Sequence, residues 1–244
     1  MSGVIVTGPP KAEAKDVDAL AGYGVAIVHE AMGRTGLLPA RLRPVQQGVR
    51  VAGTAVTVLS WPGDNLMIHA AVEQCGAGDI LVVTTTSPST DGMFGELFAT
   101  ALQRRGVRGL VIDAGVRDTR ELRELGFPAW SAAVSAQGTA KATGGSVNVP
   151  VALGGRVVRP GDVILADDDG VVVVPRERAR AAVEASEVHE AKEAATRAAF
   201  QDGQLGLDRY GLREKLTRLG VTYVSYEDHV RGETHSQDGA GAGA

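Results

Sequence analysis

Three neighbouring groups of residues have types and spacing that could do chemistry on a small acid. Arg117 and Asp118 stand together after an apolar run, where an arginine could bind an oxyanion and an aspartate could hold a hard cation. Glu96 lies one expected helix earlier in the chain and could move a proton. Gly95 precedes it at the expected helix start, whose free backbone amides attract an anion.

Each of these residues also has an ordinary structural explanation. Asp118 could cap the helix expected to begin at Thr119, and Arg117 could form a surface salt bridge, each contributing about 1 kcal/mol or less. Gly95 could simply ease a tight turn. Their positions favour chemistry, because the strand end before Arg117 and the helix start at Gly95 should meet at one edge of an α/β sheet, where ligands most often bind.

Other reactive side chains are expected to be structural. Asp167, Asp168 and Asp169 could hold a hard cation, but adjacent carboxylates in a turn point in different directions, so we expect a solvated β-turn. Cys75 falls in the apolar phase of a helical segment and is expected to be a buried thiol. The histidines lack the paired spacing of zinc ligands, and the stretch CGAGD precedes a strand, so we predict neither a zinc site nor a dinucleotide site.

Composition is that of an ordinary globular chain. The 244 residues are 44% hydrophobic, which allows one sizeable core. The net charge of −4 gives no global attraction to nucleic acid or to an anionic membrane, and no apolar run could span a bilayer. One cysteine, and an opening without a charged-then-apolar leader, lead us to expect a cytoplasmic location.

Hydrophobic periodicity predicts alternating helices and strands, and therefore an α/β fold. We expect a long helix over about 175–202, starting behind Pro175 and ending before Gly203. A single domain is expected over 1–231, with a disordered tail at 232–244. The shorter elements are expected as helices at 16–24, 64–75, 93–106 and 119–126, and strands at 24–31, 50–60, 78–87 and 107–115, followed by several short strands over 129–174.

Three stretches carry a family resemblance: GDNLMIHAAVE, GELFATALQRRGVRGLVIDAGVRD and GLDRYGLREKLTRLGVTY. Together they resemble the 4-carboxy-4-hydroxy-2-oxoadipate and 4-hydroxy-4-methyl-2-oxoglutarate aldolases, which share a superfamily with the regulator of ribonuclease E activity A proteins. The resemblance covers roughly residues 5 to 228. It implies a layered α/β sandwich related to swivelling β/β/α domains.

The resemblance also implies a metal-dependent aldolase. Such an enzyme cleaves 4-carboxy-4-hydroxy-2-oxoadipate to pyruvate and oxaloacetate with Mg²⁺ or Mn²⁺, and also decarboxylates oxaloacetate. By resemblance, Asp118 holds the metal and Arg117 stabilises the developing oxyanion. The substrate carboxylate is expected on the backbone amides of Gly95, Glu96, Leu97 and Phe98.

The remaining roles come from the same resemblance. Glu96 is expected to transfer a proton through an ordered water, and Asn65 to contact substrate, although Asn65 could equally be a helix cap. Glu193 on the long helix is expected to reach the metal's water shell from a neighbouring subunit. The family implies a homotrimer or homohexamer acting in the degradation of aromatic compounds.

A second function class remains open, namely a regulator-type binding protein that keeps the scaffold and acts on a ribonuclease or another protein. The joint presence of Glu96, Asp118, Glu193 and the segment GLDRYGLREKL favours the enzyme. A methyltransferase is not expected, because no glycine-rich cofactor turn follows a first strand.

Overall fold

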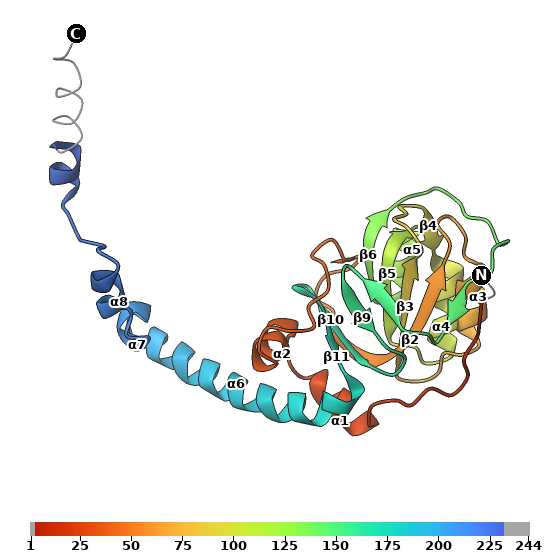
Figure 1. Cartoon of the computed structure of the whole chain (residues 1–244), viewed down its shortest axis with the longest axis horizontal. Helices are drawn as coiled ribbons and strands as arrows, with labels where there is room; N and C mark the ends of the chain where they lie inside the picture. The colour runs from red at the N-terminus through yellow and green to blue at the C-terminus, as the bar shows by residue number, and fades with distance from the viewer. Residues whose placement is uncertain (1–2, 232–244) are drawn as a thin grey trace, which may run out of the picture. The chain divides into compact units, whose positions relative to one another are not determined.

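A computed structural model describes residues 3–231 and divides the chain into two compact units (Figure 1). The first unit ends at Glu190 and the second begins at Ala191. This boundary falls inside one continuous helix, α6 (Ala179–Gln201). A boundary within a helix does not by itself separate two folds, so the single domain expected over 1–231 stays a prediction. The tail expected at 232–244 lies outside the described residues.

The first unit is built on one large mixed sheet (Figure 1). Its strand order is β1-β6-β5-β3-β2-β10-β11, while β4 pairs with β5, β7 pairs with β2, and β8 and β9 form a separate hairpin. The strands are β1 Arg43–Pro44, β2 Val51–Ser60, β3 Asp79–Thr85, β4 Gly92–Phe94, β5 Gly109–Val116, β6 Ala129–Val134, β7 Ser146–Val147, β8 Val151–Leu153, β9 Arg156–Val158, β10 Val163–Asp167 and β11 Gly170–Val174.

Strands β2, β3, β5 and β6 are parallel, and helices connect them. Helix α3 (Leu66–Val72) follows β2, α4 (Glu96–Arg104) follows β3 and β4, and α5 (Thr119–Leu125) follows β5. Each of these helices therefore begins beyond the carboxyl end of a parallel strand. This arrangement brings three helix starts to one edge of the sheet.

Side chains alternate along each strand and fill three apolar clusters. On β3, Leu81 and Val83 pack under α3, α4 and α5, whereas Ile80 and Val82 point into the interior of the nearly closed, barrel-like sheet. A third cluster lies between the antiparallel strands β10 and β11 and the helices α1 (Ala14–Leu20), α2 (Val25–Ala31) and the first turns of α6. The sheet is thus covered by helices over both its parallel and its antiparallel parts.

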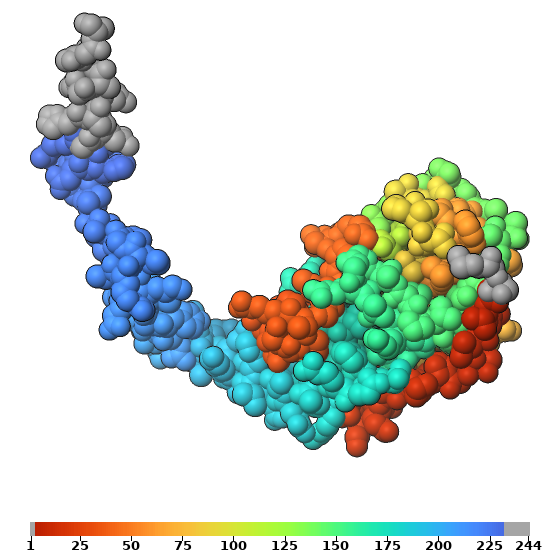
Figure 2. Space-filling model, viewed as in Figure 1, coloured from red at the N-terminus to blue at the C-terminus, as the bar shows by residue number. Residues whose placement is uncertain are grey.

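The extended segment expected at 24–31 is wrong, because this stretch forms α2. Val25, Val28 and Met32 are all buried against the third cluster, and their spacing of three and four is the period of a helix. The β-branched residues favoured a strand locally, but packing on β10 and β11 decides the structure. In Figure 2, the orange-red atoms of α2 lie on the surface beside the cyan atoms of this region.

The other expected elements are confirmed. Strands stand at 51–60, 79–85 and 109–116, and helices α3, α4, α5 and α6 fall within their expected segments, whereas α1 overlaps its segment but begins earlier, at Ala14. A short 3₁₀ turn, η1 (Arg176–Arg178), leads from Pro175 into α6, and α7 (Gly206–Arg209) and α8 (Leu212–Arg218) follow it. The predicted α/β class with its long C-terminal helix is therefore correct. Within residues 3–231, every helix is too short or too polar to cross a bilayer.

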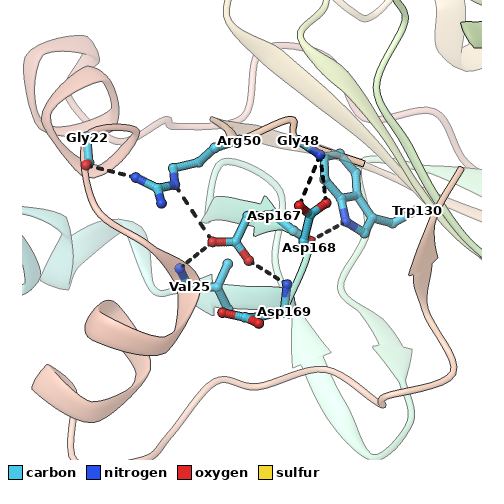
Figure 3. A network of polar contacts seen from close by, with 8 residues as sticks. All are labelled: Gly22, Val25, Gly48, Arg50, Trp130, Asp167, Asp168 and Asp169. Carbon is cyan, nitrogen blue, oxygen red and sulfur yellow. Dashed lines mark hydrogen bonds and ion pairs between the residues drawn. The ribbon is translucent and has the colours of Figure 1, made fainter. Parts of the chain in front are cut away.

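The turn expected at 167–169 is present between β10 and β11 with Asp168 and Asp169 exposed, but Asp167 is not solvated, because it lies in a packed junction (Figure 3). Asp167 is buried, and its Oδ2 accepts a 2.9 Å hydrogen bond from the amide of Val25 at the start of α2. Its backbone oxygen accepts a bond from Trp130 Nε1, while Asp168 accepts the amide of Gly48. These carboxylates hold chain segments together, and no metal-binding group of three such side chains exists among the described residues.

Cys75 gives a direct test of this core. The thiol is buried, as expected, and burial raises its pKa to about 12, with the negative charge of Asp79 adding to the effect. The thiolate is the nucleophile, and a raised pKa leaves little thiolate at pH 8. We therefore predict that Cys75 reacts with a thiol-specific disulfide reagent about a thousandfold more slowly in the folded protein than in urea. Reaction at the rate of a free thiol without denaturant would contradict the buried position. Cys75→Ala, which has no thiol, gives the background signal of the reagent.

Candidate active site

Three helix starts converge on one cavity of about 260 Å³ in the first unit. Asn65 precedes α3, Gly95 precedes α4, and Asp118 precedes α5, and all three residues line the cavity. They come from the carboxyl edge of the parallel strands, which is the edge of an α/β sheet where ligands most often bind. The rest of the wall consists of His69, Val72, Gly92, Met93, Leu97, Phe98, Ala101, Arg117 and Lys141.

Asp118 has a backbone conformation that is uncommon for a residue other than glycine. Its φ of 54° lies in the left-handed region, which aspartate tolerates better than most residues. The side chain makes no capping hydrogen bond to α5. Instead Oδ2 accepts a 3.2 Å hydrogen bond from the amide of Glu96 and lies 3.6 Å from Nε of Arg117. The local explanation of Asp118 as a side-chain helix cap therefore does not describe this carboxylate.

Gly95 is explained by the close approach of that carboxylate. Its backbone is extended, with φ of −155°, so a left-handed turn is not the reason for glycine here. A Cβ at position 95 would overlap Oδ2 of Asp118 and would lie 3.1 Å from Cγ of Arg117. Glycine therefore leaves the space in which the Arg-Asp pair packs on the start of α4.

Asn65 presents a buried hydrogen-bond acceptor that the protein leaves without a partner. The cap of α3 comes from the preceding residue, because Oδ1 of Asp64 accepts the amide of Leu66 at 2.9 Å. Asn65 donates from Nδ2 to the carbonyl oxygen of Met93, but its buried Oδ1 has no hydrogen-bond partner. A buried unsatisfied acceptor costs on the order of 1–3 kcal/mol, so a ligand that donates to it would be favoured.

Only part of the expected amide cradle is free at the start of α4. The amide of Glu96 is used by Asp118, and the first helical bond joins the amide of Ala99 to the oxygen of Gly95. The amides of Leu97 and Phe98 remain as orphan donors at the helix terminus. The side chain of Glu96 does not line the cavity, because its Oε1 accepts a 2.7 Å hydrogen bond from Thr100 one turn along the helix.

Two wall residues were not predicted as part of the site. Lys141 lies in the loop between β6 and β7, and His69 was considered only as a zinc ligand. One signal pointed to Lys141, which is the only charged residue between Glu124 and Arg156. Partial burial, together with the positive charge of Lys141, lowers the pKa of His69, which favours the neutral imidazole.

Asp64 holds the Lys141 loop against the start of α3. Its Oδ2 accepts the amides of Ala142 and Thr143, each at 2.8 Å. Burial works to raise the pKa of Asp64, but the hydrogen bonds from Leu66, Ala142 and Thr143 outweigh it and lower the pKa below its usual value. One carboxylate therefore fixes both the helix start and the loop that carries the cation.

Two predicted site residues do not line this cavity. The side chain of Glu96 bonds Thr100 instead, and Glu193 lies on α6 in the second unit, whereas the cavity belongs to the first. The expected role of Glu193 at a neighbouring subunit stays a prediction. The cavity itself combines two cationic side chains, one half-exposed carboxylate and a helix N-terminus, which suits a small anion that also carries hydroxyl groups.

Comparison with known proteins places the chain among described families. The family model described as RraA-like, Aldolase/RraA, matches residues 17–173. A protein of Halalkalibacterium halodurans with the provisional name 4-hydroxy-4-methyl-2-oxoglutarate aldolase is 28% identical over 183 residues, which cover 75% of this chain and 87% of that protein. The 4-hydroxy-4-methyl-2-oxoglutarate aldolase of Thermus thermophilus is 34% identical over 46% of this chain and 68% of its own length.

A solved structure with a different functional description is also similar. Streptomyces coelicolor RraAS2 is described as an unusual member of the RNase ES inhibitor RraA protein family. It is 30% identical to this chain, with a TM-score of 0.68, and the match covers 77% of this chain and 99% of RraAS2. The same fold therefore carries names of two functional classes.

Gly95→Ala tests the close packing at the site. The added Cβ forces the Asp118 carboxylate off the amide of Glu96, so we expect the free energy of unfolding to fall by about 1–2 kcal/mol in urea denaturation. Gly76→Ala is the matched control, since its nearest new neighbour would be 3.9 Å away and little change is expected. Equal stability of the two variants would show that the carboxylate is not held at this helix start.

Asp64→Asn tests the anchored loop through its pH dependence. Because the folded pKa of Asp64 is lowered, its stabilising effect is complete above the unfolded value of about 3.8 and is lost as the pH falls through the folded value. We expect the variant to lose about 2 kcal/mol or more of unfolding free energy at pH 7, and the gap to wild type to shrink below about pH 3.8. Urea denaturation over a pH series measures it, with the exposed Glu73→Gln as control. A gap that is constant with pH would exclude this role.

Proposed function

The chain belongs to the Aldolase/RraA family, and from this premise we propose that it is an aldolase that cleaves 4-hydroxy-2-oxo acids and releases pyruvate. The observation that carries the proposal is the placement of Arg117 and Asp118 on the start of α4, inside the cavity. Names of relatives from two organisms support the activity class. We propose 4-carboxy-4-hydroxy-2-oxoadipate, cleaved to pyruvate and oxaloacetate, and 4-hydroxy-4-methyl-2-oxoglutarate as substrates.

The cavity offers matching groups for the pyruvyl end of such a substrate. The C1 carboxylate fits the orphan amides of Leu97 and Phe98 at the positive end of α4. Arg117 lies beside this helix start and would stabilise the negative charge that develops on the C2 oxygen when the C3–C4 bond breaks. The unpartnered Oδ1 of Asn65 is suited to accept a hydrogen bond from a water held with the substrate.

The donor set fits a weakly chelated divalent ion, Mg²⁺ or Mn²⁺. Within residues 3–231, the hydrogen bond from the Glu96 amide and the ion pair with Arg117 both involve Oδ2 of the Asp118 carboxylate, and the side chain is 39% exposed, so the carboxylate has room for a cation. Mg²⁺ keeps several waters and accepts one protein carboxylate together with substrate oxygens. When bound, such an ion supplies Lewis-acid stabilisation to the charge on the 2-oxo oxygen.

The proton leaving the C4 hydroxyl needs an acceptor, and Glu96 is proposed for this role. Its backbone is fixed at the start of α4 by Asp118, while its carboxylate bonds Thr100 and stands back from the cavity wall. A water between Glu96 and the substrate is therefore part of the proposal. The same enolate of pyruvate forms when oxaloacetate loses carbon dioxide, so oxaloacetate decarboxylation should accompany aldol cleavage.

Self-association is part of the proposed function. We propose a homotrimer or homohexamer in which Glu193 of α6 approaches the water shell of the metal in a neighbouring copy. The length of α6, 23 residues with buried residues only in its first turns, supports an intersubunit role. A cytoplasmic pathway for aromatic compounds is the corresponding setting.

A regulator-type protein is the second candidate, favoured by the 30% identity to Streptomyces coelicolor RraAS2. Such a protein would use its surface and would not need a reactive cavity. The two functions therefore predict different effects of one substitution in the cavity. Such a substitution should impair an enzyme but not a ribonuclease regulator, which needs no turnover of a 2-oxo acid.

Asp118→Asn tests the enzyme. After treatment with a chelator, the wild-type protein should release pyruvate from oxaloacetate and from 4-carboxy-4-hydroxy-2-oxoadipate only when Mg²⁺ or Mn²⁺ is restored. In the variant, kcat/KM should fall by about a hundredfold or more, because the amide of Asn carries no charge. Lactate dehydrogenase coupling measures pyruvate. Glu121→Gln, an exposed acid in the first turn of α5, is the control and should keep wild-type activity.

Two results would count against the proposal. Absence of pyruvate from both substrates with either metal would leave the regulator-type function as the better candidate. Full activity of Asp118→Asn would move the metal to another residue.

A further inference from the structure

The wall of the cavity contains two cationic side chains, and only one of them has an anionic partner. Nε of Arg117 lies 3.6 Å from Oδ2 of Asp118. Lys141 also lines the cavity, but within residues 3–231 its ammonium group forms neither an ion pair nor a hydrogen bond. Its side chain is exposed. A cation that the protein leaves open in this way is suited to bind an anion that enters the cavity.

The loop that carries Lys141 is fixed on both sides of this residue. Before it, the carbonyl oxygen of Ala140 accepts the amide of Asn65 at 3.0 Å. After it, the amide of Ala142 donates to Oδ2 of Asp64 at 2.8 Å. A backbone that is already ordered loses less entropy when its side chain binds a ligand. The loop therefore presents the ammonium group from a defined point beside the start of α3.

The charge of Lys141 acts inside the cavity, on the side formed by α3. Partial burial lowers the pKa of His69, which lines the cavity from α3, and the positive charge of Lys141 lowers it further. The ring of His69 packs on the ring of Phe98 from α4, with centroids 4.4 Å apart. Arg117 lies elsewhere in the wall, beside the start of α4, where a Cβ on Gly95 would be 3.1 Å from its Cγ. The two cations therefore serve different parts of the cavity.

Each proposed substrate has a carboxylate on C4 in addition to its C1 carboxylate. The amides of Leu97 and Phe98 are assigned to the C1 carboxylate, and Arg117 is assigned to the C2 oxygen. The other charged residues of the wall are Asp118, which is assigned to the metal, and Lys141. A second carboxylate that entered the cavity without a cation would lose its hydration without compensation. Lys141 is the group of the wall that can provide this compensation.

We infer that Lys141 binds the carboxylate attached to C4 of the substrate and thereby selects 4-hydroxy-2-oxo acids that carry one. The inference rests on the proposed function and deepens it. In the reaction, the C4 hydroxyl loses its proton and becomes a carbonyl, while the C3–C4 bonding pair passes into the pyruvate enolate, which takes up a proton at C3. The carboxylate on C4 stays attached to the new carbonyl carbon. The second product is therefore also a 2-oxo acid, and substrates that would release a simple aldehyde or ketone are disfavoured.

Two acids of similar shape test this role by binding alone. 2-Oxoglutarate carries a carboxylate on C4, and 5-methyl-2-oxohexanoate has methyl groups in place of the carboxylate oxygens. We expect isothermal titration of the Mg²⁺-loaded wild-type protein to give a lower Kd for 2-oxoglutarate. In Lys141→Gln, the ratio of the Kd values should shift against 2-oxoglutarate by about tenfold or more, because a charge-assisted hydrogen bond is lost. An unchanged ratio overturns the inference.

Further variants separate a specific contact from a general effect of charge. Lys141→Arg keeps a cation at the same point of the loop and should retain more of the preference for 2-oxoglutarate than Lys141→Gln does. Lys15→Gln removes an exposed lysine of α1 that lies outside the cavity, and it should leave the Kd ratio at the wild-type value. An equal shift in Lys15→Gln and Lys141→Gln would show that net charge causes the preference, and would overturn the inference.

Turnover of 4-hydroxy-4-methyl-2-oxoglutarate distinguishes failure of the inference from failure of the proposed function. If the wild-type protein releases pyruvate from this substrate but Lys141→Gln leaves the Kd ratio unchanged, only the inference fails. If the wild-type protein releases no pyruvate and binds neither acid, both fail. If it binds 2-oxoglutarate through Lys141 but releases no pyruvate, the carboxylate site stands and the aldolase proposal fails.

Discussion

The site depends on the packing of one carboxylate, that of Asp118, against the first turn of α4. Oδ2 accepts the amide of Glu96, the left-handed backbone of Asp118 turns the side chain away from its own helix, and the missing side chain of Gly95 leaves room for it. This contact joins the end of β5 to the start of α4. It also brings Arg117 beside the orphan amides of that helix, so charge and hydrogen-bond donors converge on one small volume.

The parallel part of the sheet makes this convergence possible. Because β2, β3 and β5 run in one direction, α3, α4 and α5 all begin at the same edge, and each contributes residues from its start. The antiparallel strands β10 and β11 serve a different purpose, since they carry α1, α2 and the first turns of α6. The buried Asp167 joins these parts by binding the start of α2 and the indole of Trp130 on β6 (Figure 3).

Polar groups at the site are divided between those the protein satisfies and those it leaves open. Asp64 is fully engaged with Leu66, Ala142 and Thr143, and so keeps the loop of Lys141 in place. Oδ1 of Asn65 remains buried and unpaired. Such a contrast is typical of a site prepared for a ligand, because the structural carboxylate stabilises the fold while the unsatisfied acceptor costs stability until a donor arrives.

The sequence by itself determined most helices and strands, because hydrophobic periodicity and glycine positions are local signals. It also determined that Gly95, Glu96, Arg117 and Asp118 lie at one edge of the sheet, because helices that follow parallel strands begin at the same edge. Only the tertiary structure decided that α2 is a helix, that Asp167 is buried, and that Lys141 and His69 enter the cavity. These features depend on contacts between segments far apart in the chain, such as the bond between Val25 and Asp167. Local periodicity carries no information about such partners, so their roles follow from packing alone.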